Sequence, residues 1–151
     1  MKISAKTRYG LRALVDLAIH DIGSPVPLIN IANRQEISIN YLEQVFALLK
    51  KANIVRSIKG AQGGYILARK SDKITVADVI RAIEGDIMIV EEEPPRNEVS
   101  MLYQNFTQCL QEKVWNKITD SVNEVVNNIT IESLVRQYQE NAYNDVGMYY
   151  I

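Results

Sequence analysis

The sequence has very little cysteine and histidine. Among its 151 residues, Cys109 is the one thiol and His20 the one imidazole. A lone cysteine cannot form an internal disulfide, and we expect no metal site of the multi-cysteine type. His20 lies at the end of an expected helix, where a histidine is more often a partner of the helix dipole than a metal ligand.

Long apolar runs are also lacking. The first residues are interrupted by Lys6, Arg8, Arg12 and Asp16, so they do not form the apolar core of a signal peptide, and no run approaches the roughly 18 residues of a membrane span. We therefore expect a cytoplasmic protein. A hydrophobic fraction of 47% excludes a disordered chain and allows one real core, or a small domain with an appendage.

An excess of one charge is absent overall, because the formal net charge is −1, but the two halves differ. Residues 1–85 hold 13 Lys and Arg against 7 Asp and Glu, whereas residues 86–151 hold 4 against 11. A basic N-terminal half joined to an acidic C-terminal half is typical of a nucleic-acid-binding module with a separate function attached.

The most informative stretch runs from Ser38 to Tyr65. Ser38 is a good N-cap, and the apolar residues Leu42, Val45, Phe46 and Leu49 follow at helical spacing, which predicts a helix with one buried face. The other face carries Asn40, Tyr41 and Gln44, whose side chains can read a base edge or hold a phosphate, and Ser38 at the start of the helix is a further candidate DNA contact. The helix should close on Lys50 and Lys51, which suit its C-terminal dipole.

Two short strands are expected next, at residues 54–59 and 65–69, joined by the glycine-rich loop at residues 60–64. The strand before the loop carries Arg56 and Lys59. A helix followed by a basic, glycine-tipped hairpin indicates the recognition helix and wing of a winged helix-turn-helix domain, in which the helix enters the major groove and the wing reaches the backbone or minor groove. The alternative is a similar hairpin in a domain that binds nothing.

The flanking elements fit this interpretation. We expect a first helix over residues 6–20, a short second helix over 28–34, a turn at 35–37, and a fourth helix capped by Thr75 and ended by Gly85. A basic group precedes or opens the first helix and is a candidate phosphate contact, although a solvated basic N-terminus is equally compatible with the spacing: Lys2, Ser4, Lys6 and Arg8.

Residues 86–100, with the acidic and proline-rich stretch at 91–95, are expected to be a linker between the winged domain at 1–85 and a second unit. That unit, residues 101–137, should hold a long helix with one apolar stripe and a short last helix over 128–137. Two copies packing around a two-fold axis would cover the stripe, although it could instead fold back on its own winged domain. The stripe consists of Leu102, Phe106, Leu110, Val114, Ile118, Val122, Val125 and Ile129. Cys109 is expected to be buried on its flank, and the alternative is a redox-active thiol that faces the dimer mate.

The residues MKISAKTRYGLRALVDLA, ISINYLEQVFALLKKANIVRSIKGAQGGYIL and ITVADVIRAIEG resemble the IscR/NsrR/CymR (Rrf-two) superfamily of winged-helix transcription regulators. The resemblance covers residues 1–85, and the YLEQ and GxxGGY motifs make it specific. It implies a mainly α protein with a small two-stranded wing, and a homodimer that binds palindromic DNA.

Some members of that superfamily hold an iron–sulfur cluster on three cysteines, of which this sequence matches only the last, at Cys109. Because a cluster needs several thiolates, we expect no cofactor and a closer similarity to the CymR-like branch. The resemblance then implies a repressor of cysteine and sulfur metabolism genes. The alternatives are an IscR-like iron–sulfur sensor with an incomplete or labile cluster site, and a winged domain used only for protein contacts.

The last residues form an expected tail, 138–151, which ends in Tyr149, Tyr150 and Ile151. By resemblance to the CymR-like branch, these three residues would dock on the cysteine-synthesising enzyme O-acetylserine thiol-lyase, although packing on the protein's own dimer is an open alternative. An enzyme is not expected, because the sequence has no paired carboxylates, nucleophile–base set or phosphate loop.

Overall fold

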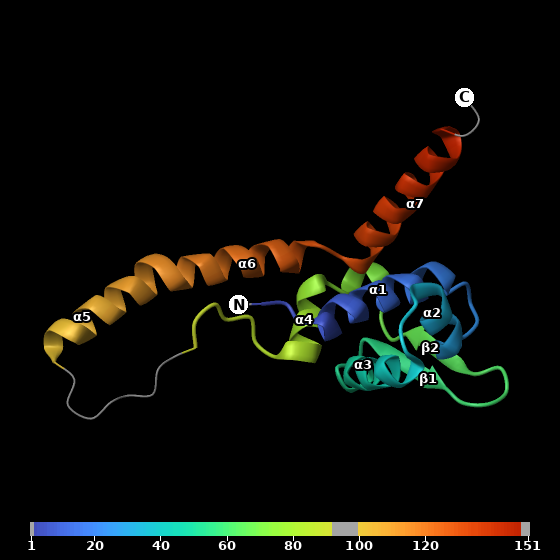
Figure 1. The fold of residues 1–151 in the computed structure, drawn as a ribbon, viewed down its shortest axis with the longest axis horizontal. Helices are drawn as coiled ribbons and strands as arrows, with labels where there is room; N and C mark the ends of the chain where they lie inside the picture. The colour runs from blue at the N-terminus through green and yellow to red at the C-terminus, as the bar shows by residue number, and fades with distance from the viewer. Residues whose placement is uncertain (1, 92–99, 149–151) are drawn as a thin grey trace.

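The computed structural model describes residues 2–91 and 100–148. The described part is mainly helical with one two-stranded antiparallel hairpin, which confirms the predicted fold class (Figure 1). Its elements in chain order are α1 (Ala5–His20), α2 (Leu28–Gln35), α3 (Ile39–Lys51), β1 (Val55–Ile58), β2 (Gly64–Leu67), the 3-10 turn η1 (Ser71–Lys73), α4 (Val76–Glu84), α5 (Met101–Leu110), the π-helical segment η2 (Gln111–Trp115), α6 (Asn116–Asn128) and α7 (Ile131–Met148).

One hydrophobic core joins the helices of the N-terminal domain. Leu14 and Leu17 from α1, Ile31 from α2 and Phe46 from α3 are fully buried in it, as their helical spacing predicts. Ile131, at the first turn of α7, is also fully buried in this core. The C-terminal part of the chain is therefore anchored to the domain formed by the N-terminal part.

Side-chain caps set where the helices begin. The hydroxyl groups of Ser4, Ser38 and Thr75 accept hydrogen bonds from backbone N–H groups in the first turns of α1, α3 and α4. Asp78 completes a capping box with Thr75. At the other end of α2, Glu36 adopts a left-handed conformation with φ of 55°, which ends that helix and turns the chain toward α3.

Gly10 lets three helices approach one another. A Cβ atom at this position of α1 would lie 2.8 Å from Ile83 Cδ1 of α4 and 3.1 Å from Val45 Cγ1 of α3. Both distances are shorter than ordinary carbon–carbon contacts of about 3.5–4.0 Å. Glycine at this position thus permits the close packing of α1 on α3 and α4.

The hairpin pairs Val55 with Leu67 and Ile58 with Gly64. Val26, between two prolines, adds an isolated bridge to Tyr65, with both backbone N–H groups donating at 2.9 and 2.8 Å. The end of β2 that adjoins the loop is thereby fastened to the segment that leads into α2.

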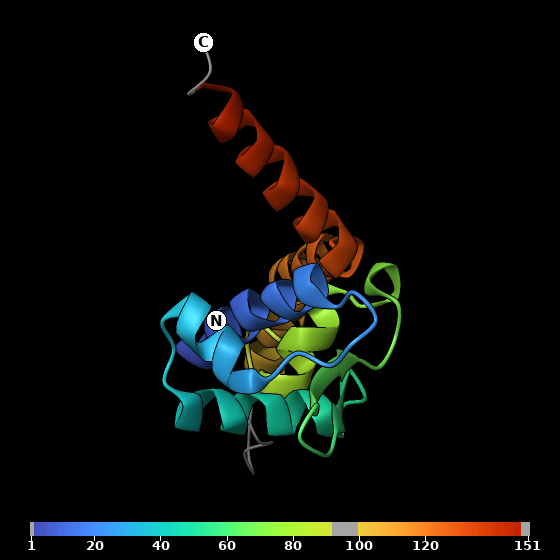
Figure 2. The same cartoon turned by 90° about the vertical axis from the view of Figure 1, so that its right-hand side faces the viewer.

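A second apolar cluster attaches the C-terminal helices to α4. Val76, Ala77 and Ile80 of α4 are buried there against the partly buried Val122 and Val126 of α6. A bridge between Thr75 and Thr130 continues this attachment to the start of α7. Beyond it, α5 with the far part of α6 projects from the domain, and α7 projects from the side opposite α3 (Figures 1 and 2).

The C-terminal region departs from the sequence prediction in two ways. The long helix is interrupted by the π-helical segment Gln111–Trp115, in which each turn contains more residues than an α-turn. The last helix, predicted to end at Gln137 before a tail, continues to Met148. It continues because residues 138–148 contain no proline and Tyr138, Ala142 and Val146 repeat the four-residue spacing that begins at Leu134.

None of the helices in residues 2–91 and 100–148 combines the length and apolar character needed to cross a membrane.

Candidate nucleic-acid interface

Helix α3 has the two faces that its sequence predicts. Leu42, Val45, Phe46 and Leu49 are buried, whereas Asn40 and Gln44 are exposed on the opposite side. Lys50 and Lys51 are exposed in its last turn. The helix therefore presents hydrogen-bonding groups near its start and positive charge at its end.

Two predicted contact residues of this helix have structural partners as well. The Ser38 hydroxyl accepts a hydrogen bond from the Tyr41 backbone N–H at 3.3 Å. The Tyr41 ring is half-buried and meets the Tyr9 ring of α1 edge to face, with centroids 5.7 Å apart. Ser38 and Tyr41 thus fix the start of α3 against α1, and Asn40 and Gln44 are its freer polar side chains.

The basic N-terminal group lies at the start of α1, which is bonded to the end of α4. Lys2 and Arg8 are exposed and Lys6 is half-buried, whereas the Ser4 hydroxyl caps α1. Ser4 also donates its backbone N–H to Glu84 Oε1 at 2.8 Å, and the Thr7 hydroxyl donates to the same oxygen. These two hydrogen bonds fasten the N-terminal segment to the end of α4.

The Thr7 hydroxyl bond has an electrostatic consequence. It lowers the pKa of the Glu84 carboxyl, and the Ser4 bonds act in the same direction against the effect of desolvation. Glu84 is therefore held ionised where the basic N-terminal segment meets α4.

The hairpin carries its predicted cations on the outside. Arg56 on β1 and Lys59 beside the loop are both exposed, and the loop projects from the domain (Figure 1). Gly60 has φ of 113°, in the left-handed region that favours glycine. The Tyr65 ring packs edge to face on Phe46 of α3, with centroids 4.9 Å apart. The hairpin is therefore packed directly on α3 through these two rings.

Tyr65 stays a neutral phenol in this position. Burial raises its pKa, and the negative charge of Glu43 adds to the effect.

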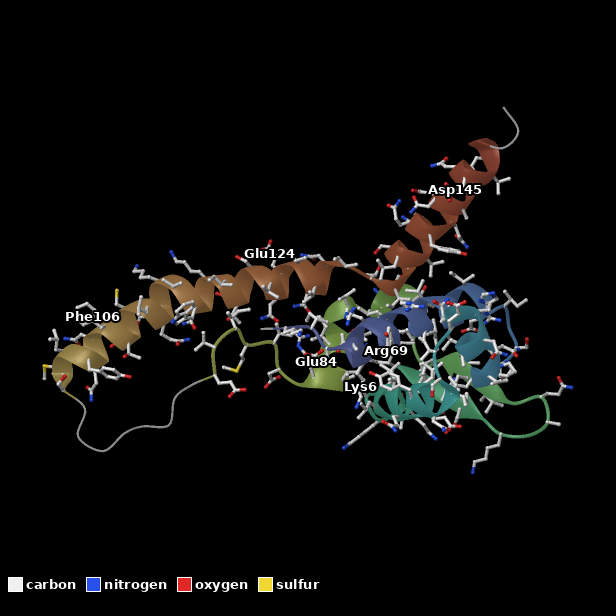
Figure 3. The ribbon with its side chains drawn as sticks, viewed as in Figure 1. Lys6, Arg69, Glu84, Phe106, Glu124 and Asp145 are labelled. Carbon is white, nitrogen blue, oxygen red and sulfur yellow. The ribbon has the colours of Figure 1, made fainter. Side chains whose placement is uncertain are left out.

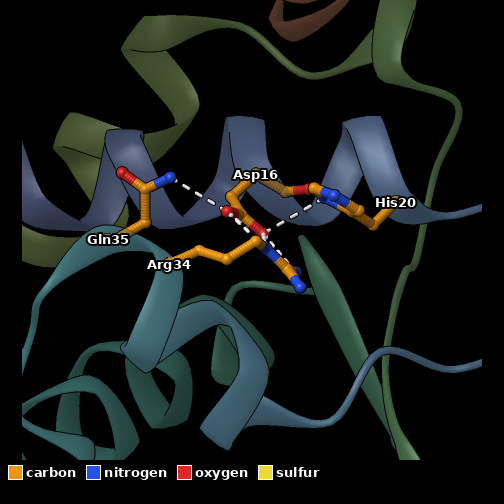
Figure 4. A network of polar contacts seen from close by, with 4 residues as sticks. All are labelled: Asp16, His20, Arg34 and Gln35. Atoms are coloured by element: carbon orange, nitrogen blue, oxygen red, sulfur yellow. Dashed lines mark hydrogen bonds and ion pairs between the residues drawn. The ribbon is translucent and has the colours of Figure 1, made fainter.

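A polar network that the sequence prediction missed holds α2 on α1 (Figure 4). The Asp16 carboxylate of α1, with its side chain only 3% exposed, accepts hydrogen bonds from Arg34 Nε and Nη2 and from Gln35 Nε2. Arg12 Nη2 donates to the backbone carbonyl of Gln35, and His20 Nδ1 lies 2.8 Å from the Asp16 carbonyl oxygen. The network fixes the C-terminal end of α2, directly before the turn into α3.

The sequence contains a signal for this network. Asp16 stands between Ala13, Leu14 and Leu17 on the buried face of α1, where an acidic residue requires a hydrogen-bonded or charged partner. The partner could not be named from the sequence, because Arg34 comes from a different helix.

The predicted apolar stripe of the long helix is partly buried against the N-terminal domain and partly exposed. Val122 and Ile129 are partly buried in the cluster around α4, but five of its members are exposed on the described chain: Leu102, Phe106, Leu110, Ile118 and Val125. Val114 is half-buried within the helix. Figure 3 shows Phe106 on α5, away from the N-terminal domain. In the described chain, only Val122 and Ile129 of the stripe therefore pack on the cluster around α4.

Cys109 was expected to be buried, and in the described chain it is exposed. The reason is that α5 projects away from the domain and has no buried residue. Tyr149, Tyr150 and Ile151, the predicted docking residues, lie outside the described residues.

The helix-turn-helix, the hairpin beside it and the exposed polar face of α3 together define a winged helix-turn-helix protein. A model of the Rrf2 family, described as "Iron-dependent Transcriptional regulator", matches residues 3–137. This match spans most of the chain. The chain belongs to the Rrf2 family of transcriptional regulators, and it is a DNA-binding regulator rather than an enzyme.

Relatives and solved structures agree with this membership. The chain is 36% identical over 135 residues to the HTH-type transcriptional regulator IscR of Pectobacterium atrosepticum, covering 89% of this chain and 79% of that protein. IscR of Sodalis glossinidius is 38% identical with the same coverage. The structure of CymR, the "Global Cysteine Regulator of B. subtilis", superposes with a TM-score of 0.75 at 36% identity, covering 91% of this chain and 98% of that one. T. potens IscR superposes with a TM-score of 0.71 at 38% identity, covering 93% and 90%.

These comparisons contradict the expectation that the protein has no cofactor. The curated relatives carry the name IscR, an iron–sulfur regulator, and the family description is iron-dependent. The chain's own residues do not supply a thiolate ligand set, because Cys109 is its one cysteine. In residues 2–91 and 100–148 no three His, Cys, Asp or Glu side chains gather where they could hold a metal ion.

Proposed function

We propose that this regulator acts as a homodimer that binds palindromic DNA, with α3 in the major groove and the β1–β2 hairpin on the flanking backbone. The observation that supports this proposal is the shared packing of α3 and the hairpin through Phe46 and Tyr65. This packing holds the polar face of α3 and the cations of the hairpin in a fixed relation. A rigid pair of reading elements is what groove binding at a defined register requires.

The contacts differ in what they would read. Gln44 and Asn40 carry amides, which can form paired hydrogen bonds with adenine in the major groove. Lys59, Arg56, Lys2, Lys6 and Arg8 carry charges that suit phosphates, whose contacts position the protein without selecting a sequence. The dimer would use the exposed apolar side chains of α5, with Leu102, Phe106 and Leu110 against their copies.

The experiment compares Gln44→Ala and Lys59→Ala on the preferred duplex, found by selection from a random pool, and on a scrambled duplex. Gln44→Ala should lose about 1–3 kcal/mol on the preferred duplex and relax one base position. Lys59→Ala should weaken both duplexes alike and reduce the slope of log K against log salt by about one unit. Lys117→Ala, at an exposed position of α6, is the matched control and should bind as wild type. Full binding by both test variants would refute the assigned face.

Iron–sulfur-dependent regulation in the manner of IscR is the form that the comparisons favour, since the relatives at 36% and 38% identity bear that name. Anaerobic purification, followed by measurement of visible absorbance and of iron and acid-labile sulfide per chain, tests it. A colourless, iron-free protein after reconstitution with iron and sulfide would exclude this form. Cys109→Ser should reduce the bound iron if the thiolate is a ligand.

A second form, repression of cysteine and sulfur metabolism genes, has the similarity to B. subtilis CymR in its favour. Sequencing of the genomic fragments that the protein retains would distinguish the two forms by the genes beside the bound sites. Docking on O-acetylserine thiol-lyase remains a prediction from the sequence, and no comparison supports it. Removal of residues 150–151 should abolish that complex, and an unchanged titration with the enzyme would refute the docking.

A further inference from the structure

A cavity of 680 Å³ lies between the N-terminal domain and α7. Leu11, Val15 and Ile19 of α1 form one wall, and Leu134 and Tyr138 of α7 form the other. Small-molecule sites in proteins typically have volumes of roughly 300–1,000 Å³ and mainly apolar walls with a few polar groups. The cavity has both properties.

Apart from the Tyr138 hydroxyl, its polar side chains belong to the network that holds α2. Arg12, Asp16, His20, Arg34 and Gln35 line the cavity. The oxygens of this group are already used: both Asp16 carboxylate oxygens accept from Arg34 Nε, Gln35 O accepts from Arg12, and Asp16 O faces His20.

The donors are used only in part. A guanidinium has five N–H donors on three nitrogens. The hydrogen bonds of both arginines to described residues involve Nε and Nη2, which leaves the Nη1 groups for another acceptor. The Nε2 atom of His20 can also bond to another acceptor, because the contacts of this imidazole with described residues use Nδ1.

The unused N–H donors beside the apolar walls favour a ligand that has both a negatively charged acceptor group and an apolar part. A ligand with hydrogen-bond acceptors and a negative charge satisfies the guanidinium groups, and a carboxylate matches their planar fork. A cationic ligand would meet two arginines and only one carboxylate, whose oxygens are occupied. The rest of the ligand must be apolar and small enough for the space between α1 and α7.

We propose that this cavity binds a small carboxylic acid with an apolar or aromatic body, and that this binding modulates the affinity for DNA. The modulation rests on the proposed DNA-binding function. Arg12 and Arg34 fix the end of α2 at Gln35. The turn into α3 begins at the next residue, Glu36, in its left-handed conformation, and α3 begins at Ile39. A carboxylate bound to the Nη1 groups competes with Asp16 and the Gln35 carbonyl for the positive charge of the same guanidinium groups. The bonds that hold α2 therefore weaken, and the position of α3 changes with that of α2.

The probe is 2-naphthoate, with the uncharged 2-naphthamide as its matched control, titrated into the full-length protein by calorimetry. The acid should bind at least about tenfold more tightly than the amide, because a charge-assisted hydrogen bond contributes about 1.5–3 kcal/mol. Arg12→Gln should remove this preference, and Arg8→Gln on the same helix should keep it. Val15→Trp, which fills the apolar part, should abolish binding of both compounds, and Leu134→Trp provides the same test from the opposite wall.

DNA affinity is measured first without any probe, so that failure of DNA binding is recognised separately as failure of the proposed function. With 2-naphthoate at saturation, the affinity for the preferred duplex should fall, and an unchanged affinity would refute the modulation. Equal binding of acid and amide, no binding, or binding retained in both folded tryptophan variants would refute the site. Binding that weakens as the protein concentration rises would show that a second copy fills the cavity, and this also refutes it.

Discussion

Asp16→Asn is the most direct test of the network between α1 and α2. The substitution keeps the size of the side chain and one acceptor oxygen, but it removes the charge and turns an N–H₂ group toward the donors of Arg34 and Gln35. The Asp16 side chain is 3% exposed and that of Arg34 is 36% exposed. The pair is therefore buried on one side and hydrated on the other.

The magnitude follows from this asymmetry. Removing one partner of a fully buried ion pair costs about 3–5 kcal/mol. Water reaches Arg34 and recovers part of that cost, so we expect a loss of about 2 kcal/mol in the free energy of unfolding. For a chain of this size this loss corresponds to a fall in Tm of about 4–8 °C.

The assay is urea unfolding of four proteins: wild type, Asp16→Asn, Arg34→Met and the double variant. The double variant should lose less than the two single losses together, by about 1–2 kcal/mol, because each single change already breaks the shared interaction. Asp145→Asn, at an exposed position of α7, is the control and should unfold as wild type. Additivity within about 0.5 kcal/mol, or an Asp16→Asn protein as stable as wild type, would show that the network does not hold α2.

Three further predictions concern other parts of the chain. Gly10→Ala should lower the free energy of unfolding by about 1 kcal/mol, because the clash of its Cβ with Ile83 and Val45 exceeds the gain in helix propensity, and a stabilised variant would contradict the close packing. Ile118→Asp should convert the dimer to a monomer in light scattering at micromolar concentration, since Ile118 is an exposed member of the apolar stripe, whereas Glu124→Asp should leave the mass unchanged. Glu84 has a lowered pKa in the folded protein, so its stabilising effect is present above its unfolded pKa of about 4.3 and is lost as the pH falls through the folded value. Glu84→Gln should therefore reduce Tm at pH 7 and have no effect near pH 2, and equal reductions at both pH values would contradict this linkage.

The sequence predicts the N-terminal domain well because its signals there are local. Ser38 and Thr75 are caps that act on their own first turns, and the helical spacing of Leu42 to Leu49 needs only one partner surface, whichever helix supplies it. The exposed positions of Gln44 and Lys59 follow from the same patterns, although their roles on DNA remain predictions.

The features that the sequence did not predict depend on other segments of the chain. Asp16 is recognisable as an unusual residue in a buried face, but its partner Arg34 is brought to it by the packing of α2 on α1. The exposure of Cys109 depends on whether α5 turns toward the domain or away from it, and the periodicity of a helix cannot say which. The resemblance to the superfamily that includes IscR was predicted from local motifs, whereas the expectation of no cofactor, which came from the count of cysteines in one chain, is contradicted by the relatives.

The π-helical segment Gln111–Trp115 has a geometric consequence for any pairing of two copies. The apolar residues from Leu102 to Ile118 recur every four residues, and in an α-helix such a row drifts by about 40° at each step, or about 160° over four steps. One extra residue in a π-turn reduces this drift by about 100°. Leu102 and Ile118 therefore lie closer to the same side of the helix than they would in an uninterrupted α-helix. A left-handed coiled coil needs an average repeat of 3.5 residues, which this row does not have. Two such helices would therefore meet over a limited crossing, and deletion of one residue within the π-helical segment would rotate Leu102 and Phe106 out of it.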